Sequence, residues 1–391
     1  MSTEKAKGAN YRGLPAVLGR PGIVALTLVM NLTGYATAQM TQHYKQTPLV
    51  SNRASLAPKV DANLVNAWGL ARSSTSPWWV ADNGTGVSTL YSGTGAIVPL
   101  VVSIPGPNSS TPSGTPTGVV FNGDPAAFLL TPTSRSIFLF VTEDGTISGW
   151  APPVTQSVIK VNNFDSSVYK GATIATVTDG AATKSYLYVA DFRKGKIAVF
   201  DAAFKPVTLV PDADGDDDRD DHGKSFEDER LPHGFAPFNI QNIGGDLYVA
   251  FAKQDSARHD EVDGAGLGYV DVFSPRGRLL HRLEWGPWFD GPWGLALASG
   301  DFGAFSHDVL VGQFGSGKIL AFDPVTGKFK GMLLGTDNSP IHIDGLWAIA
   351  FGNDATAGPA TTLFFTAGPD HESNGLFGSL TAVENAQGNH Q

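Results

Sequence analysis

The strongest constraint on the fold is a segment that recurs six times along the chain. Each copy is short and apolar, and five of the six contain a glycine, as in Asn66-Ala67-Trp68-Gly69-Leu70. Two further short segments rich in Val, Ile, Phe and Tyr follow each copy, separated by a glycine-containing turn, which is the pattern of a β-meander. Equivalent points lie 49 to 67 residues apart, at Gly69, Gly118, Gly171, Phe238, Gly294 and Leu346.

Six units of this length predict a six-bladed β-propeller, because the units are rich in strand formers and show almost no helical periodicity. The extended segment 44–52 precedes the first unit, and we expect it to supply the outer strand of the last blade. That pairing would leave no open edge between the first and last blades. A β-sandwich or a β-helix is the alternative, but sandwiches lack such a repeat and β-helix coils are much shorter.

The composition agrees with a folded, turn-rich chain and removes several classes of function. The 391 residues include 46 Gly and 25 Pro but only 16% charged residues, which excludes a disordered or coiled-coil chain. Cysteine is absent, so disulfides, thiolate metal sites and cysteine nucleophiles are ruled out. The formal net charge of −10 predicts no basic face for nucleic acid.

The first 38 residues have the three-part layout of a secretory signal peptide. Four Lys and Arg residues lie in the first 20 positions, an apolar run covers 23–32, and small residues occupy 36–38. We therefore predict cleavage after Ala38, a secreted or periplasmic protein, and one propeller domain over 39–391. A membrane anchor is the alternative, but the apolar run is well short of the ~20 residues that span a bilayer.

The residues that open the recurring segments are the first candidates for a binding site. In a propeller the first strand of each blade lines the central channel, so these residues would face one mouth of it, where propellers commonly bind ligands. Asn, Thr and Asp at strand starts also satisfy backbone groups in turns, which is the structural alternative. The predicted ligand-binding residues are Asn66, Trp68, Thr117, Lys170, Asn239, Trp293, Asp344 and Trp347.

An acidic insertion at about 211–230 separates the third and fourth units. Four aspartates have the 1, 3, 5, 9 spacing of a calcium-binding loop, since alternate residues of a tight loop project inward. The loop departs from that pattern at Asp217, where such loops carry Gly, and at Gly223, where an EF-hand has Glu. A solvated acidic loop would have the same composition. The predicted ligands of Ca²⁺ are Asp212, Asp214, Asp216 and Asp220.

This calcium prediction can be tested by isothermal titration of the whole chain with millimolar calcium. We expect binding in the range of about 10⁻⁴ to 10⁻³ M, as in extracellular calcium modules. The Asp214→Ala variant should lose most of the heat, because it removes one carboxylate ligand. No heat with the parent chain, or the same heat with the variant, would exclude the site.

Several loops add polar or aromatic residues. The excursion 258–264 interrupts the fourth unit and lengthens one loop at a mouth, where propellers acquire specificity. Glu143 and Asp144 end a second strand, where they can add oxygens at one face or cap a turn. Three tryptophans fall within 285–293 and could bind planar ligands, although packing between blades uses large aromatics in the same way.

Several longer motifs resemble a family of exported bacterial and fungal proteins that are mainly conserved hypothetical proteins. The resemblance covers about 43–384 and is related in pattern to NHL-type propellers and to the calcium-dependent phosphotriesterase superfamily. It implies a propeller fold and export, and supplies no settled activity. The motifs are NLVNAWGLA (63–71), WWVADNGTGVSTLYS (78–92), GFAPFNIQNIGGDLYVAFAKQD (234–255), LVGQFGSGKILAFDP (310–324) and DGLWAIAFGN (344–353).

The phosphotriesterase superfamily, to which the family is related in pattern, includes six-bladed enzymes that hold a metal in the channel. In those enzymes a Glu, Asn and Asp set from several inner strands holds calcium, which polarises the ester or phosphoryl oxygen. This chain offers Asn66, Asn239 and Asp344 at comparable places, but no Glu on a first strand. His233, His342 and His371 lie next to predicted mouths or turns and are the candidate general bases.

Two functional hypotheses follow. The first is an exported propeller that binds a small molecule, a glycan or an extracellular protein at the channel mouth, with calcium stiffening the insertion. The alternative is a metal-dependent hydrolase of lactones, esters or phosphoesters, with the channel residues and histidines named above. No nucleic acid partner and no membrane span in the mature chain are expected.

Overall fold

The computed structural model describes residues 42–211 and 224–383, and within these ranges the chain is built almost entirely from β-strands. Its helical content there is one short 3₁₀ helix, Gly303–Phe305. No described helix has the length and apolar character needed to cross a lipid bilayer. The predicted signal peptide and the four calcium-loop aspartates lie outside the described residues.

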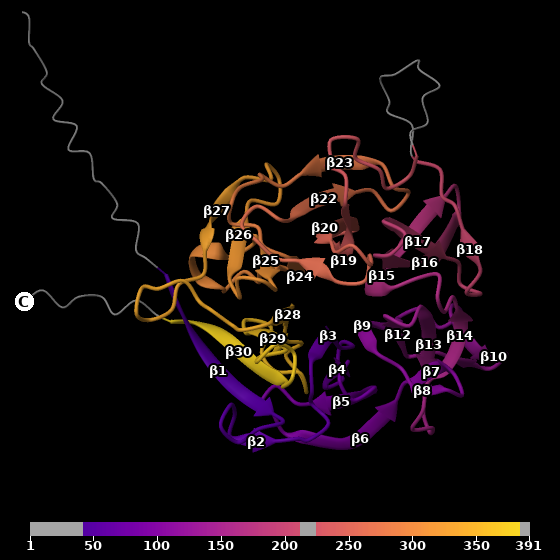
Figure 1. Cartoon of the computed structure of the whole chain (residues 1–391), viewed down its shortest axis with the longest axis horizontal. Coiled ribbons are helices and arrows are strands. Elements are labelled where there is room, and N and C mark those ends of the chain that lie inside the picture. The colour runs from indigo at the N-terminus through magenta and orange to yellow at the C-terminus, as the bar shows by residue number, and fades with distance from the viewer. Residues whose placement is uncertain (1–41, 212–223, 384–391) are drawn as a thin grey trace, which may run out of the picture. The chain divides into compact units, whose positions relative to one another are not determined.

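Six sheets of four or five strands are arranged around a common centre, as a six-bladed β-propeller (Figure 1), and all their strand pairs are antiparallel except β1 (His43–Ser51) with β2 (Lys59–Val60). From the centre outward, blade 1 is β3 (Ala67–Ala71), β4 (Trp78–Asp82), β5 (Val87–Tyr91) and β6 (Ile97–Ser103). Blade 2 is β9 (Pro116–Phe121), β12 (Phe138–Thr142), β13 (Thr146–Trp150) and β14 (Val158–Asn162). Blade 3 is β15 (Tyr169–Asp179), β16 (Ala182–Asp191), β17 (Lys196–Phe200) and β18 (Pro206–Val207).

The other three blades repeat this order and carry the additions that make the units unequal. Blade 4 is β19 (Phe235–Ile243), β20 (Asp246–Gln254), β22 (Tyr269–Phe273) and β23 (Leu279–Arg282), with the short β21 (Glu261–Val262) paired to β20. Blade 5 is β24 (Pro292–Leu297), β25 (Val309–Gln313), β26 (Ile319–Phe322) and β27 (Phe329–Met332). Two small two-stranded ribbons lie outside these sheets. The first, β7 (Pro105–Asn108) with β8 (Thr111–Ser113), comes between blades 1 and 2 in the sequence, and the second, β10 (Leu129–Thr131) with β11 (Ser134–Arg135), comes between the first two strands of blade 2.

The last blade closes the ring with a strand from the start of the described chain. Its order is β28 (Leu346–Phe351), β29 (Leu363–Ala367), β30 (Leu376–Val383) and β1 (His43–Ser51), with β2 (Lys59–Val60) at the edge. β1 pairs antiparallel with β30 along its length, from His43 opposite Val383 to Ser51 opposite Leu376. The predicted fold and its closure by segment 44–52 are therefore confirmed.

The recurring glycines are explained by the crowding of the inner strands. A Cβ on Gly294 would lie 2.7 Å from the backbone oxygen of Trp347 in the next blade, and one on Gly118 would lie 3.0 Å from the backbone nitrogen of Ala172. These contacts are tighter than a side chain tolerates without a shift of the neighbouring strand. Glycine at the opening of the inner strand thus allows adjacent blades to approach closely around the channel.

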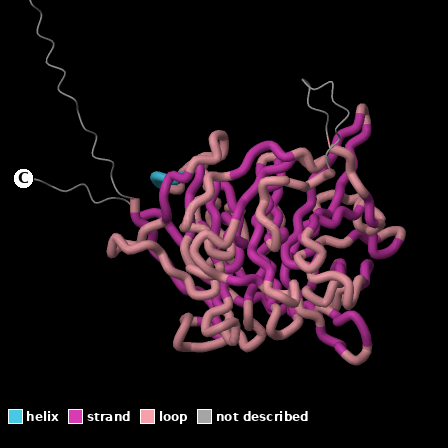
Figure 2. Tube along the Cα trace, turned by 45° about the horizontal axis from the view of Figure 1, so that its top comes forward, coloured by secondary structure: helices cyan, strands magenta, loops and turns pink. Residues whose placement is uncertain are grey.

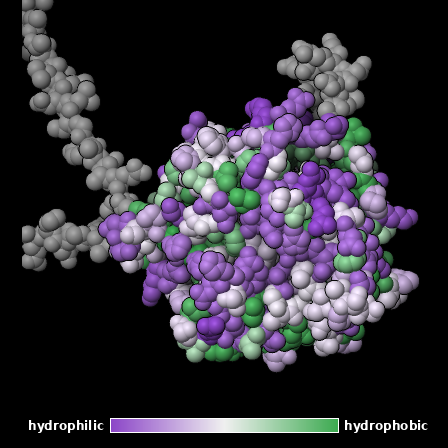
Figure 3. All heavy atoms as spheres, viewed as in Figure 1, coloured by the Kyte–Doolittle hydropathy of each residue, from purple (hydrophilic) through white to green (hydrophobic). Residues whose placement is uncertain are grey.

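Hydrophobic clusters fill the spaces between neighbouring blades. Between blades 1 and 2, for example, Trp79 stacks on Phe138 with ring centroids 4.2 Å apart. The loops join the strands at both ends of the blades (Figure 2). Hydrophilic residues cover most of the face that Figure 3 presents, and hydrophobic residues form small separate groups on it. One large cavity is lined by the inner strands of the blades.

Candidate functional site

Four aromatic rings from the inner strands meet across the channel. The rings of Trp68 and Trp347 stack with centroids 3.5 Å apart, and Trp293 lies edge-on to both at 6.0 and 5.8 Å. Phe238 completes the group at 5.9 Å from Trp347. All four are buried, and we call them the aromatic plug. The plug separates the mouth at the strand starts from the half of the channel at the strand ends.

Lys170 lies at the strand-start side of the plug, with its side chain fully buried. Its Nζ is 2.6 Å from Glu143 Oε1 and 3.2 Å from Asp260 Oδ1. The same ammonium lies 4.8 Å from the ring centroid of Trp68, at cation–π distance. Burial lowers the pKa of Lys170, but the surrounding carboxylates outweigh burial and hold that pKa above its usual value. Lys170 is therefore positively charged at neutral pH.

The groups around Lys170 come from different blades and form one chain of hydrogen bonds. Glu372 of blade 6 accepts from Asn66 of blade 1 at 2.7 Å, and Asn66 also donates to Asn83 at 3.3 Å. Asn83 donates to Glu143 Oε2 of blade 2 at 2.8 Å. Through Lys170 of blade 3 the chain continues to blade 4, where Asp260 Oδ1 lies 2.9 Å from His259 Nδ1. We call this set the mouth network: Glu372, Asn66, Asn83, Glu143, Lys170, Asp260 and His259.

The acids in and beside the mouth network have widely separated proton affinities. The hydrogen bond from His259 lowers the pKa of Asp260 to about 2. Burial raises the pKa of Glu261 to about 8, against the pull of Lys170, and burial with nearby Glu143 raises that of Glu372. Asp260 is thus ionised at neutral pH while Glu261 holds a proton, a separation typical of functional sites.

Three residues of the mouth network have the right chemistry for a metal. The ligand atoms of Glu143, His259 and Asp260 lie within 4.8 Å of one another. Both carboxylates, however, already pair with the ammonium of Lys170, which is buried between them. A divalent cation bound to the same oxygens would meet the positive charge of that lysine. The donor set therefore fits a metal poorly while Lys170 is in place.

The three residues predicted to hold a channel metal each form hydrogen bonds with a different part of the framework. Asn66 Oδ1 accepts from the indole of Trp347 at 3.0 Å, and Asn239 Oδ1 accepts from the backbone N–H of Ile240 at 2.8 Å. Asp344 is exposed and accepts from the backbone N–H of Asp370 at 2.9 Å. Each oxygen therefore has a structural partner, and metal binding by this set stays a prediction.

The remaining predicted residues divide between the site and the framework. Trp68, Trp293 and Trp347 form most of the aromatic plug. Thr117 is buried, and its hydroxyl donates to the carbonyl oxygens of Tyr169 and Val141, so it joins neighbouring strands.

The three histidines predicted as general bases are all exposed. His342 Nδ1 lies 3.0 Å from the carbonyl oxygen of Ser316, and the backbone oxygen of His233 accepts from Lys253. His371 precedes Glu372 with a positive φ of 52°. The histidine of the mouth network is instead His259, in the polar excursion 258–264. The high density of charged residues in that loop is the sequence feature that could have identified His259 as a site residue.

The comparisons with known proteins identify relatives but no activity. No protein-family model matches the chain. Uncharacterized protein R648 of Acanthamoeba polyphaga mimivirus is 31% identical over 376 residues, which cover 94% of this chain and 86% of the relative. Uncharacterized protein L690 of the same virus is 32% identical over 349 residues, which cover 86% of this chain and 85% of the relative.

Solved structures are similar at much lower identity. A structural genomics protein of unknown function from Bacteroides thetaiotaomicron is 10% identical with a TM-score of 0.51, covering 88% of this chain and 76% of that protein. Virginiamycin B lyase from Staphylococcus aureus is 11% identical with a TM-score of 0.48, and the match covers 88% of this chain and 100% of the lyase. The likeness to the Bacteroides protein concerns the fold alone. Because the sequence identity extends over most of both proteins, the chain belongs to the same protein family as R648 and L690 of Acanthamoeba polyphaga mimivirus.

Proposed function

We propose that the chain is a ligand-binding propeller that takes a small organic cation at the strand-start mouth. The observation that carries the proposal is the mouth network, in which carboxylates from blades 2, 4 and 6 surround one buried ammonium. Glu143, Asp260 and Glu372 can carry three negative charges, against one positive charge on Lys170 and at most one on His259. The mouth therefore keeps an excess of negative charge, which attracts cations and concentrates them near the channel.

Atoms of the mouth network are also available to a ligand. Lys170 and His259 contact Oδ1 of Asp260, and Asn66 contacts Oε2 of Glu372, so the second oxygen of each carboxylate has no hydrogen-bond partner among the described residues. Two such oxygens suit an amine or a guanidinium, which donates charge-assisted hydrogen bonds. A cavity of about 220 Å³ beside the network is lined by Glu143, Asp144, Asp165, Arg193 and His259, among others.

Metal-dependent hydrolysis is the second candidate, supported by the closeness of Glu143, His259 and Asp260. The pairing of both carboxylates with Lys170 is the reason we place it second. Turnover of lactones or aryl esters that chelator abolishes would favour it over cation binding. Export and the calcium loop stay predictions, because both depend on residues outside the described ranges.

The binding proposal is tested by isothermal titration of the whole chain with agmatine, a small dication with one guanidinium and one amine. We expect one site per chain, with affinity that falls as salt rises, since exposed charges are screened. Glu372→Gln should weaken binding by about tenfold, because it removes one charge next to the ligand. Glu229→Gln, which removes an exposed acid elsewhere, is the matched control and should bind like the parent.

The same titration should depend on pH. Burial raises the pKa of Glu261 to about 8, and the hydrogen bond with Asp260 raises the pKa of His259 above its usual value. As pH rises from 6 to 8.5, Glu261 therefore gains negative charge and His259 loses positive charge. Asp260, with a pKa of about 2, stays ionised throughout. Agmatine affinity should therefore increase by about fivefold over this range, and Glu261→Gln should remove the part of the increase that comes from this acid. Absence of agmatine binding, or binding that neither substitution alters, would refute the proposal.

A further inference from the structure

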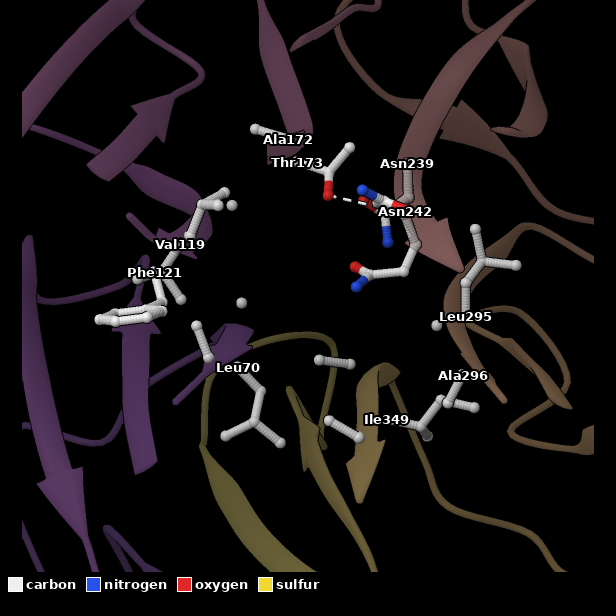
Figure 4. A pocket seen from close by; sticks show the side chains of 18 of the residues that line it. Leu70, Val119, Phe121, Ala172, Thr173, Asn239, Asn242, Leu295, Ala296 and Ile349 are labelled. Atoms are coloured by element: carbon white, nitrogen blue, oxygen red, sulfur yellow. Dashed lines mark hydrogen bonds between the residues drawn. The ribbon is translucent and has the colours of Figure 1, made fainter. Parts of the chain in front are cut away.

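The half of the channel beyond the aromatic plug is a cavity of about 620 Å³. The inner strands of all six blades line it, so its wall is rigid framework rather than mobile loop. Its volume lies within the range of about 300–1,000 Å³ that is usual for small-molecule sites. Figure 4 shows the labelled side chains arranged around an open centre. Two of the predicted ligand-binding residues, Asn239 and Trp293, line this cavity, but the cation site proposed at the mouth does not use it.

The cavity differs in character from the acidic mouth at the other end of the channel. Leu70, Val119, Phe121, Leu295 and Ile349 contribute apolar side chains to it from four blades. Polar side chains gather on the side of blades 3 and 4, where Thr173, Asn239 and Asn242 lie together (Figure 4). Its described lining contains one charged residue, Arg72, and no Asp or Glu.

Two residues of the cavity lining have side-chain N–H groups without an acceptor in the described part of the chain. The indole N–H of Trp293, a residue that is 4% exposed, has no acceptor among the described residues. A buried donor without a partner is costly unless a ligand or water meets it. Arg72 is half-buried and donates to the carbonyl oxygens of Phe351 at 2.6 Å, Gly352 at 2.7 Å and Ser73 at 3.5 Å. A guanidinium has five N–H groups, so two remain for a ligand.

From these observations we propose that the strand-end cavity binds an amphipathic organic anion, a carboxylate or sulfonate attached to an apolar body. The apolar side chains accommodate the body, and Arg72 pairs with the anionic group. No acidic side chain of the described lining opposes an anion, whereas the mouth network would repel one.

The test uses 8-anilinonaphthalene-1-sulfonate, which has two aromatic ring systems and one sulfonate, with the whole chain in solution. We expect a fluorescence titration to give one site per chain. Leu297 lines the cavity and is 42% exposed, so it can be changed with little effect on folding. Leu297→Glu should weaken binding by about tenfold through repulsion, whereas Leu297→Lys should stay within about threefold of the parent.

Val325→Glu is the matched control, because Val325 is another exposed apolar residue, at 84% exposure, and does not line the cavity. It should leave binding unchanged. Arg72→Gln should weaken binding in parallel with Leu297→Glu, and if it fails to fold, the two Leu297 variants still decide. No binding of the probe, several weak equivalent sites, or equal affinity in both Leu297 variants would overturn the proposal. These outcomes are independent of agmatine binding at the mouth.

Discussion

Replacing Lys170 with methionine is expected to destabilise the fold by about 3–5 kcal/mol, the usual cost of removing one partner from a buried ion pair. Methionine retains most of the side-chain volume, so the loss reports the charge rather than a cavity. Glu143 has a side chain only 12% exposed and would be left without its cation. Urea denaturation at pH 7, compared with the parent chain, measures the effect.

A double variant identifies the origin of that loss. Adding Glu143→Gln to Lys170→Met removes the uncompensated carboxylate, so the double variant should be more stable than Lys170→Met alone. Interaction energies between contacting residues are typically about 0.5–3 kcal/mol, which sets the size of the recovery to look for. A cost below about 1 kcal/mol for Lys170→Met, or no recovery in the double variant, would mean that Lys170 does not hold the network together.

The second large effect is expected at the strand that closes the ring. Tyr44 in β1 is 1% exposed, packs on Phe302 with ring centroids 4.7 Å apart, and donates a hydrogen bond to the backbone oxygen of Phe302 at 2.9 Å. Tyr44→Ala should therefore cost about 3–5 kcal/mol in unfolding free energy, as for other buried aromatic residues. Tyr44→Phe keeps the ring and should cost only about 1 kcal/mol.

Gln46 provides the control for this pair, because it lies in the same strand but is exposed. Gln46→Ala should change the unfolding free energy by less than about 0.5 kcal/mol. If Tyr44→Ala behaves like Gln46→Ala in thermal and urea unfolding, β1 does not contribute to closure in solution, and the ring would have to be held by the other blade contacts.

The fold could be predicted because its determinants are local and repeated. Each blade needs short apolar strands, tight turns and a small residue where inner strands crowd, and all three leave a periodic mark on the sequence. The apolar motif 78–92, for example, contains two neighbouring strands of blade 1, β4 (Trp78–Asp82) and β5 (Val87–Tyr91). The predicted closing segment 44–52 differs from β1 (His43–Ser51) by one residue at each end.

The mouth network could be predicted only in part. Lys170 and Asn66 were candidates because they open inner strands, and both lie in the network. Their partners are set by how loops of different blades meet, as in the contacts of Lys170 with Asp260, 90 residues away, and of Asn66 with Glu372, 306 residues away. Strand periodicity places the blades but not the loop conformations. His259 was missed for that reason.

The most direct test of the central claim is a crystal structure of the whole chain grown with agmatine. Our account predicts electron density for the ligand at the strand-start mouth, with its guanidinium or amine hydrogen-bonded to the carboxylates of Asp260 and Glu372. Density for agmatine only at another face, or crystals saturated with agmatine whose mouth network holds none, would contradict it.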